Sequence, residues 1–214
     1  MSAPSPRAKK DVGEHFERSA PAFDAIYTGE GVSPLRRLVH RVFFHDIHWR
    51  LALTLAECDA LAGASVLDIG CGSGVYLEEL GRRGAARLVG LDFAPAMIEL
   101  ARRRIAAAGL AHLAELRTTD FLAYPVEAPF DYFRDPGPLL QKMASITRQK
   151  AIATFPQLWN PWTAVRRVRY ALAVRDCPVH FFSRARVRRL MWAAGFREVR
   201  VRALTNIFFA VGAP

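Results

Sequence analysis

The sequence predicts an α/β fold in which a doubly wound, mostly parallel sheet carries a C-terminal antiparallel hairpin and an N-terminal helical cap. Short apolar runs alternate with amphipathic segments over residues 65–118, which is the order strand, helix, strand. A glycine-rich stretch, residues 70–74, follows the first apolar run directly. Two alternating apolar runs joined by three residues end the chain, as a hairpin would.

The segments before the first strand predict a tail and a helical cap. Residues 1–10 are rich in Pro, Ser, Ala and Lys and predict a disordered tail. Residues 11–62 form the predicted cap, because apolar side chains recur at helical spacing over residues 35–61. The main domain is predicted over residues 63–214, with residues 156–180 as a substrate lid.

The strands and helices of the main domain are predicted from runs and punctuation. Each helix begins at a proline, serine or glycine-rich turn or ends next to a glycine. The predicted strands are Ser65–Ile69, Arg87–Leu91, Leu113–Thr118, Ala151–Phe155, Glu198–Ala203 and Ile207–Val211. The predicted helices are Tyr76–Arg83, Pro95–Ala108, Pro138–Thr147 and Ser183–Ala194.

Composition narrows the class of protein. The net charge is +10, and 26 of the 30 basic residues are arginine. A basic surface for nucleic acid, anionic lipid or an acidic substrate is one interpretation. A bias toward Ala and Arg is the other, and the scatter of the arginines favours it.

Three cysteines without metal or redox spacing predict no disulfide framework, no metal site and a cytoplasmic location. No stretch approaches the roughly 20 apolar residues of a membrane helix.

The glycine-rich stretch predicts a ligand site. Gly70, Gly72 and Gly74 lie between a strand and a helix, where glycine lets the main chain turn tightly and approach a ligand. The start of the helix adds N–H donors. Asp92 ends the next strand, 18 residues after Gly74, and can accept hydrogen bonds from ribose hydroxyls; the alternative is a cap of the helix that begins at Pro95.

These motifs together resemble class I S-adenosylmethionine-dependent methyltransferases. The resemblance is sharpest over residues 65–122, where Leu67–Gly74 is followed by Gly90–Ile98. It implies a Rossmann-like fold, S-adenosyl-L-methionine as cofactor and a small-molecule methyl acceptor. The turn has the form G-x-G-x-G, whereas nicotinamide enzymes use G-x-G-x-x-G. Residues 155–181 weakly resemble magnesium-protoporphyrin O-methyltransferases.

The resemblance also implies roles for single residues. Asp68 would reach the methionine amino group, Gly70 and Gly72 would line methionine and ribose, and Asp92 would hold the ribose. Phe93 would lie against adenine, Asp120 would accept from the adenine amino group, and Phe121 would pack on the ring. The full set of predicted cofactor-binding residues is Tyr27, Asp68, Gly70, Cys71, Gly72, Gly74, Asp92, Phe93, Met97, Asp120 and Phe121.

The sequence departs from the family pattern between Leu113–Thr118 and Ala151–Phe155, where the family has a further strand, its fourth. Residues 128–132 look like its start, whereas residues 133–138 already look like the loop and helix that follow it. A strand of about 5–6 residues and a loop of about 2–6 should lie between them. We infer that about ten residues have been lost; the alternative is a short strand over residues 130–134.

Three functions are compatible with these residues. The first is methyl transfer to an oxygen or carbon of a small molecule, with His180 as the candidate general base. The second is a cofactor-binding protein impaired in catalysis by the shortened strand. The third is a nucleic-acid methyltransferase, which the missing Asn/Asp-Pro-Pro-Tyr motif disfavours. A monomer or a homodimer is expected.

Overall fold

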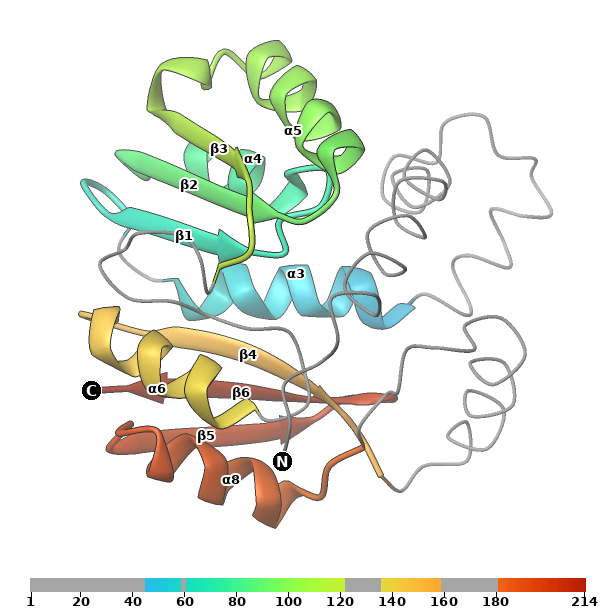
Figure 1. Ribbon diagram of the computed structural model, residues 1–214, viewed down its shortest axis with the longest axis vertical. Coiled ribbons are helices and arrows are strands. Elements are labelled where there is room, and N and C mark those ends of the chain that lie inside the picture. Colours follow the sequence, from blue (N-terminus) through green and yellow to red (C-terminus); the bar gives the residue numbers. More distant parts are fainter. Residues whose placement is uncertain (1–44, 59–60, 122–135, 159–180) are drawn as a thin grey trace, which may run out of the picture. The chain divides into compact units, whose positions relative to one another are not determined.

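The computed structural model describes residues 45–58, 61–121, 136–158 and 181–214, and these fall into two compact units (Figure 1). The first unit holds the described residues up to Phe121, and the second holds those from Pro136 onward. The predicted tail, most of the predicted cap and most of the predicted lid lie outside the described residues.

The first unit contains a three-stranded parallel sheet in the order β1-β2-β3. Val66 of β1 lies opposite Leu88 of β2, which lies opposite Ala114 of β3. The three predicted strands and the helices predicted over residues 76–83 and 95–108 are confirmed to within one residue at each end, whereas α3 covers only part of the helical segment predicted over residues 35–61 and η1 was not predicted. In chain order the elements are α3 (His45–Glu57), β1 (Ser65–Ile69), α4 (Val75–Arg82), β2 (Arg87–Asp92), α5 (Pro95–Ala107), the 3-10 helix η1 (Ala111–Leu113) and β3 (Ala114–Thr118).

The core of the first unit forms between the sheet and its helices. Leu77 of α4, Leu88 of β2 and Ile98 of α5 are fully buried. Gly90, in the middle of β2, lies so close to its neighbours that an added Cβ would stand 2.6 Å from Leu77 and 2.7 Å from Leu116. The strand can lie under α4 at this point because residue 90 has no side chain.

The second unit contains an antiparallel sheet in the order β4-β6-β5. The predicted C-terminal hairpin is confirmed, because β5 and β6 pair antiparallel. Ser183 caps α8 as predicted, and its Oγ accepts a hydrogen bond from the Arg186 N–H at 3.2 Å. The elements are α6 (Pro136–Ile146), β4 (Ala151–Pro156), α8 (Arg184–Ala193), β5 (Glu198–Ala203) and β6 (Ile207–Ala213).

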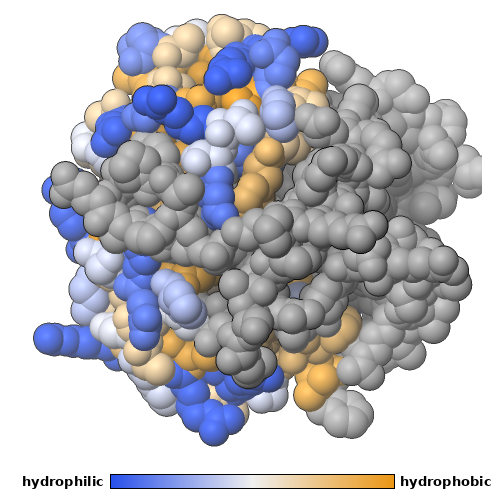
Figure 2. Space-filling view, viewed as in Figure 1, coloured by the Kyte–Doolittle hydropathy of each residue, from blue (hydrophilic) through white to orange (hydrophobic). Residues whose placement is uncertain are grey.

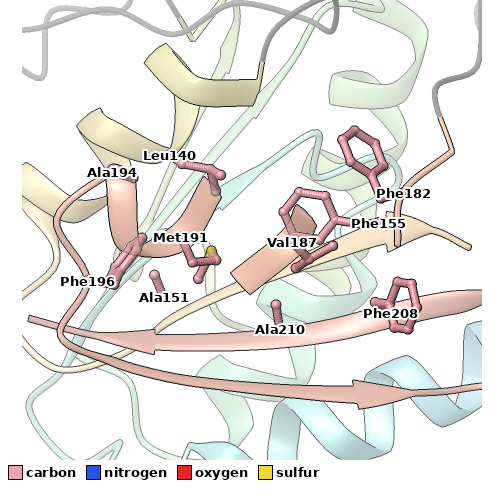
Figure 3. Packing of buried hydrophobic residues seen from close by; sticks show 10 residues of the cluster. All are labelled: Leu140, Ala151, Phe155, Phe182, Val187, Met191, Ala194, Phe196, Phe208 and Ala210. Carbon is pink, nitrogen blue, oxygen red and sulfur yellow. The ribbon is translucent and has the colours of Figure 1, made fainter. Parts of the chain in front are cut away.

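Helices α6 and α8 both pack on one face of this antiparallel sheet (Figures 1 and 3). Leu140 of α6 joins Val187 and Met191 of α8 in a cluster that rests on β4 and β6. Phe155 of β4 lies edge-to-face with Phe182, with ring centroids 5.3 Å apart. The cluster gives the second unit a core of its own.

The outer edges of the two sheets are relevant to the shortened strand that the sequence predicts within residues 128–134, which is not β4. β1 pairs with β2 and β4 pairs with β6, and no described strand pairs with the second edge of either. The segment in which the sequence predicts a shortened strand, residues 122–135, lies outside the described residues. The α/β fold is thus confirmed, with parallel pairing in the first unit, whereas the loss of the fourth strand stays a prediction.

Arginine side chains are exposed in both units. In the first, Arg82 and Arg103 pair with glutamates one helical turn away. In the second, the arginines of α8 are exposed, and Figure 2 shows hydrophilic residues on the part of this unit where α8 lies. Arg188 covers the ring of Trp192, which is 48% exposed. Among the described residues, no helix has the length and hydrophobicity needed to cross a membrane.

Candidate functional site

The candidate site lies at the carboxyl ends of the three parallel strands. Asp68 stands near the end of β1, Asp92 ends β2, and Asp120 follows β3 by two residues. Because the strands are parallel and in register, their carboxyl ends meet at one edge of the sheet. This edge is where ligands of open α/β sheets bind.

The turn between β1 and α4 is held open by glycine. Gly70, Gly72 and Gly74 have φ angles of 72°, 53° and 79°, in the left-handed region that side chains disfavour. The N–H groups of Gly70 and Cys71 both donate to the Leu91 carbonyl, at 2.8 and 3.0 Å. Helix α4 has Gly74 as its N-cap and no side-chain cap. The turn therefore presents main chain, and not side chains, beside the start of a helix.

Asp92 connects all three strand ends. Its Oδ2 accepts from the Gly72 N–H at 2.9 Å, and its Oδ1 accepts from the Ala94 N–H at 2.9 Å. Its main-chain carbonyl accepts from the Thr119 N–H at 2.9 Å. The two carboxylate oxygens together offer about four acceptor positions, so the carboxylate can also accept from a ligand hydroxyl beside its main-chain donors. The N-cap of α5 is Ala94, with no side-chain cap, so the alternative of Asp92 as that cap is wrong.

Asp68 is the second buried carboxyl group of the site. Its Oδ2 is inaccessible and has no hydrogen-bond partner among the described residues. Burial raises the pKa of Asp68 to about 7, the Asp92 carboxylate adds to the rise, and the Arg50 guanidinium of α3 opposes it. Burial also raises the pKa of Asp92, against the effect of its main-chain donors. A carboxylate held at this energetic disadvantage is suited to a cationic ligand.

Asp68 gives the folded chain a specific pH dependence. A carboxyl group whose pKa is raised on folding stabilises the fold below its unfolded pKa, 3.8, and this contribution is lost as the pH rises through about 7. We expect Asp68→Asn to be more stable than the parent at pH 8, by up to about 4 kcal/mol, and to lose this advantage toward pH 4.

Urea denaturation of both proteins without ligand, at pH 5 and pH 8, measures the difference. Contributions from other titrating groups largely cancel between parent and variant. If the parent and the variant differed in free energy of unfolding by the same amount at both pH values, the pKa of Asp68 would not be raised on folding.

The other predicted cofactor-binding residues take several positions. The side chain of Cys71 is 6% exposed and packs in the core, so only its main chain lies in the turn. Met97 and Phe121 are buried as well, at 1% and 4%. Phe93 and Asp120 are half-buried next to the strand ends. Tyr27 and the candidate base His180 lie outside the described residues.

Two arginines of the site were missed by the sequence interpretation. Arg50 has a buried Nε without a hydrogen-bond partner among the described residues. Arg104 of α5 contacts the glycine turn through the Ser73 carbonyl. The helical spacing of Ile47, Arg50 and Leu51 could have placed Arg50 on the inward face of its helix. Arg104 carried no signal, because arginine is the commonest charged residue of the chain.

The sequence matches known methyltransferases over part of its length. A family model described as a methyltransferase domain matches residues 66–161. A demethylmenaquinone methyltransferase of Tropheryma whipplei is 33% identical over 96 residues, which cover 38% of this chain and 38% of that protein. A ubiquinone biosynthesis O-methyltransferase of Neisseria meningitidis is 30% identical over 122 residues, which cover 52% of this chain and 51% of that protein. An EEF1A lysine methyltransferase 2 of Danio rerio is 35% identical over 129 residues, which cover 60% of this chain and 45% of that protein. The chain thus spans about half or less of these relatives.

Solved structures share the fold at lower sequence identity. Magnesium protoporphyrin IX methyltransferase from Synechocystis with bound S-adenosylhomocysteine aligns with a TM-score of 0.65 and 17% identity, over 96% of this chain and 100% of that one. A geranyl diphosphate methyltransferase aligns with a TM-score of 0.69 and 14% identity, over 96% of this chain and 98% of that one. These structures confirm the predicted Rossmann-like fold, and the sequence matches confirm the predicted resemblance to methyltransferases.

Proposed function

We propose that this chain, which carries a methyltransferase domain over residues 66–161, transfers the methyl group of S-adenosylmethionine to an oxygen or carbon of a small-molecule acceptor. The observation that carries the proposal is the position of Asp92. One carboxylate holds the glycine turn and lies at the ends of three parallel strands, where a ribose can be bound.

The residues at the strand ends fit this cofactor. The buried Oδ2 of Asp68 suits an ammonium group, and the buried Nε of Arg50 suits a carboxylate. An α-amino acid carries both charges, so the two side chains complement the methionine end of the cofactor. Asp92 would bind the ribose, and Phe93 and Asp120 would contact adenine. With this ligand bound, the buried Asp68 and Arg50 would each have a group of opposite charge.

For methyl transfer, the protein mainly has to hold the cofactor and the acceptor in the right positions. When bound, S-adenosylmethionine supplies a methyl group on a sulfonium, and the acceptor forms its new bond to that carbon while the carbon–sulfur bond breaks. The chain fixes the glycine turn and the two carboxylates, so the methyl group can be held in line with an acceptor. His180 would take the proton that an acceptor hydroxyl releases.

Arg50 provides a test of the orientation of the cofactor. We expect Arg50→Met to weaken S-adenosylhomocysteine about 10- to 100-fold, because a charge-assisted hydrogen bond is lost. Binding of 5′-methylthioadenosine, which lacks the amino-acid end, should not change. Calorimetric titration of both ligands measures this.

Arg87→Met is the matched control, because Arg87 begins β2 at the opposite end from Asp92 and forms an exposed pair with Glu115. Equal weakening of both ligands by Arg50→Met would assign Arg50 a role in folding and not in recognition.

A protein acceptor is the second candidate, favoured by the 35% identity to the EEF1A lysine methyltransferase. The purified chain is incubated with S-adenosylmethionine labelled in its methyl group, together with the small-molecule fraction of a cell extract or with its protein fraction. Label in the small-molecule products supports the proposal, whereas label in protein alone supports the second candidate. Ligand binding without any transfer would support a cofactor-binding protein impaired in catalysis.

A further inference from the structure

Arg104 connects the glycine turn to both helices that flank it. Its Nε donates to the Ser73 carbonyl at 2.9 Å, and its Nη1 lies 3.2 Å from Glu78 Oε2. Arg82 binds the other oxygen of Glu78 at 2.7 Å. The Arg104 side chain is 19% exposed, so solvent screens this pair less than it screens the surface pairs.

The same face of α5 contacts the turn a second time. Ala101 lies three residues before Arg104, on one helical face. A Cβ added to Gly74 would stand 3.0 Å from the Ala101 Cβ and 3.2 Å from its Cα. Helix α5 therefore holds Ser73 by a hydrogen bond and Gly74 by close packing.

The turn requires such support from outside. Three of its five residues are glycines with positive φ, and glycine populates many backbone conformations when it is not constrained. Gly72, which donates to Asp92, directly precedes Ser73. A shift of the Ser73 carbonyl would move the Gly72 N–H and the first turn of α4 together. A displacement of about 1 Å at such a site can cost up to about 100-fold in function.

We propose that Arg104 is a positioning residue of the cofactor site, which fixes the glycine turn through the Ser73 carbonyl and Glu78 without contacting the ligand. The proposal rests on the proposed function for its ligand. Its structural part, the order of the turn, stands on the contacts of Arg104 alone.

The test combines ligand affinity with hydrogen exchange at the turn. We expect Arg104→Ala to raise the Kd for S-adenosylhomocysteine at least about tenfold and to accelerate exchange of the Gly72 amide in the ligand-free protein. Arg104→Lys keeps the charge and a donor. Its Kd for S-adenosylhomocysteine and its exchange rate at the Gly72 amide should lie between those of Arg104→Ala and the parent. Arg103→Ala is the matched control, because Arg103 is the neighbouring residue and its pair with Glu99 is exposed.

Each outcome decides a separate point. Arg104→Ala that binds the ligand and protects Gly72 as the parent does would overturn the proposal. If Arg104→Ala does not fold, Arg104→Lys and Glu78→Gln carry the same comparison, and parent-like behaviour of both would overturn it. If the parent binds no S-adenosylhomocysteine, the proposed function fails, whereas the exchange measurement still tests the role of Arg104.

Discussion

Asp92→Ala is expected to weaken binding of S-adenosylhomocysteine by at least about 100-fold. The substitution removes the carboxylate that would accept from the ribose hydroxyls, and each charged hydrogen bond contributes about 1.5–3 kcal/mol. It also removes the acceptor that holds the Gly72 N–H, so the glycine turn loses one of its contacts with β2, while the bonds from the Gly70 and Cys71 N–H groups to Leu91 stay in place. Isothermal titration calorimetry of the folded variant measures the change.

Two further variants separate charge from position. Asp92→Asn keeps one acceptor oxygen and should weaken binding less than Asp92→Ala. Glu115→Ala removes a carboxylate near the start of the neighbouring strand β3, away from the carboxyl ends of the strands, and should bind as the parent does. If Asp92→Ala kept parental affinity, the ribose would have to be bound elsewhere.

Gly74→Val is expected to be the most destabilising change in the turn, by about 2–5 kcal/mol. Residue 74 has φ of 79°, a conformation that costs a side chain about 1–2 kcal/mol. Its Cβ would also press against the main chain of Ala101, which cannot move aside as a flexible side chain can. Overpacking of this kind costs about 1–3 kcal/mol, and urea unfolding of variant and parent measures the total.

Gly63→Val isolates the conformational part. Gly63 has a similar φ of 75°, but nothing lies within 4 Å of its added Cβ. It should lose only about 1–2 kcal/mol. Equal losses at both positions would mean that α5 does not press on the turn.

Much of the first unit could be predicted because its signals are local. The apolar run Ser65–Ile69 became β1 with the predicted bounds, and Pro95 began α5 as predicted. The apolar hairpin at the chain end was equally readable, because alternation and a short connection determine both strands and their pairing. Glycines with a strand before and a helix after them were enough to predict the turn on which the candidate site is built.

Long-range contacts were not predictable in the same way. That Asp92 accepts from the Gly72 N–H, 20 residues away, depends on how two strand ends meet and not on either segment alone. Arg50 and Arg104 are two of 26 arginines, so nothing in the residue type distinguished them. The pairing of β4 with β6 likewise depends on residues more than 50 positions apart.

The central claim is that the carboxyl ends of β1, β2 and β3 bind an adenosyl amino acid. Calorimetric titration of the purified chain with S-adenosylhomocysteine, and separately with NAD⁺, tests it most directly, because both ligands contain adenosine and only the first carries an amino acid. The account predicts one site for S-adenosylhomocysteine and no binding of NAD⁺. No heat of binding with S-adenosylhomocysteine, or equal affinity for NAD⁺, would contradict it.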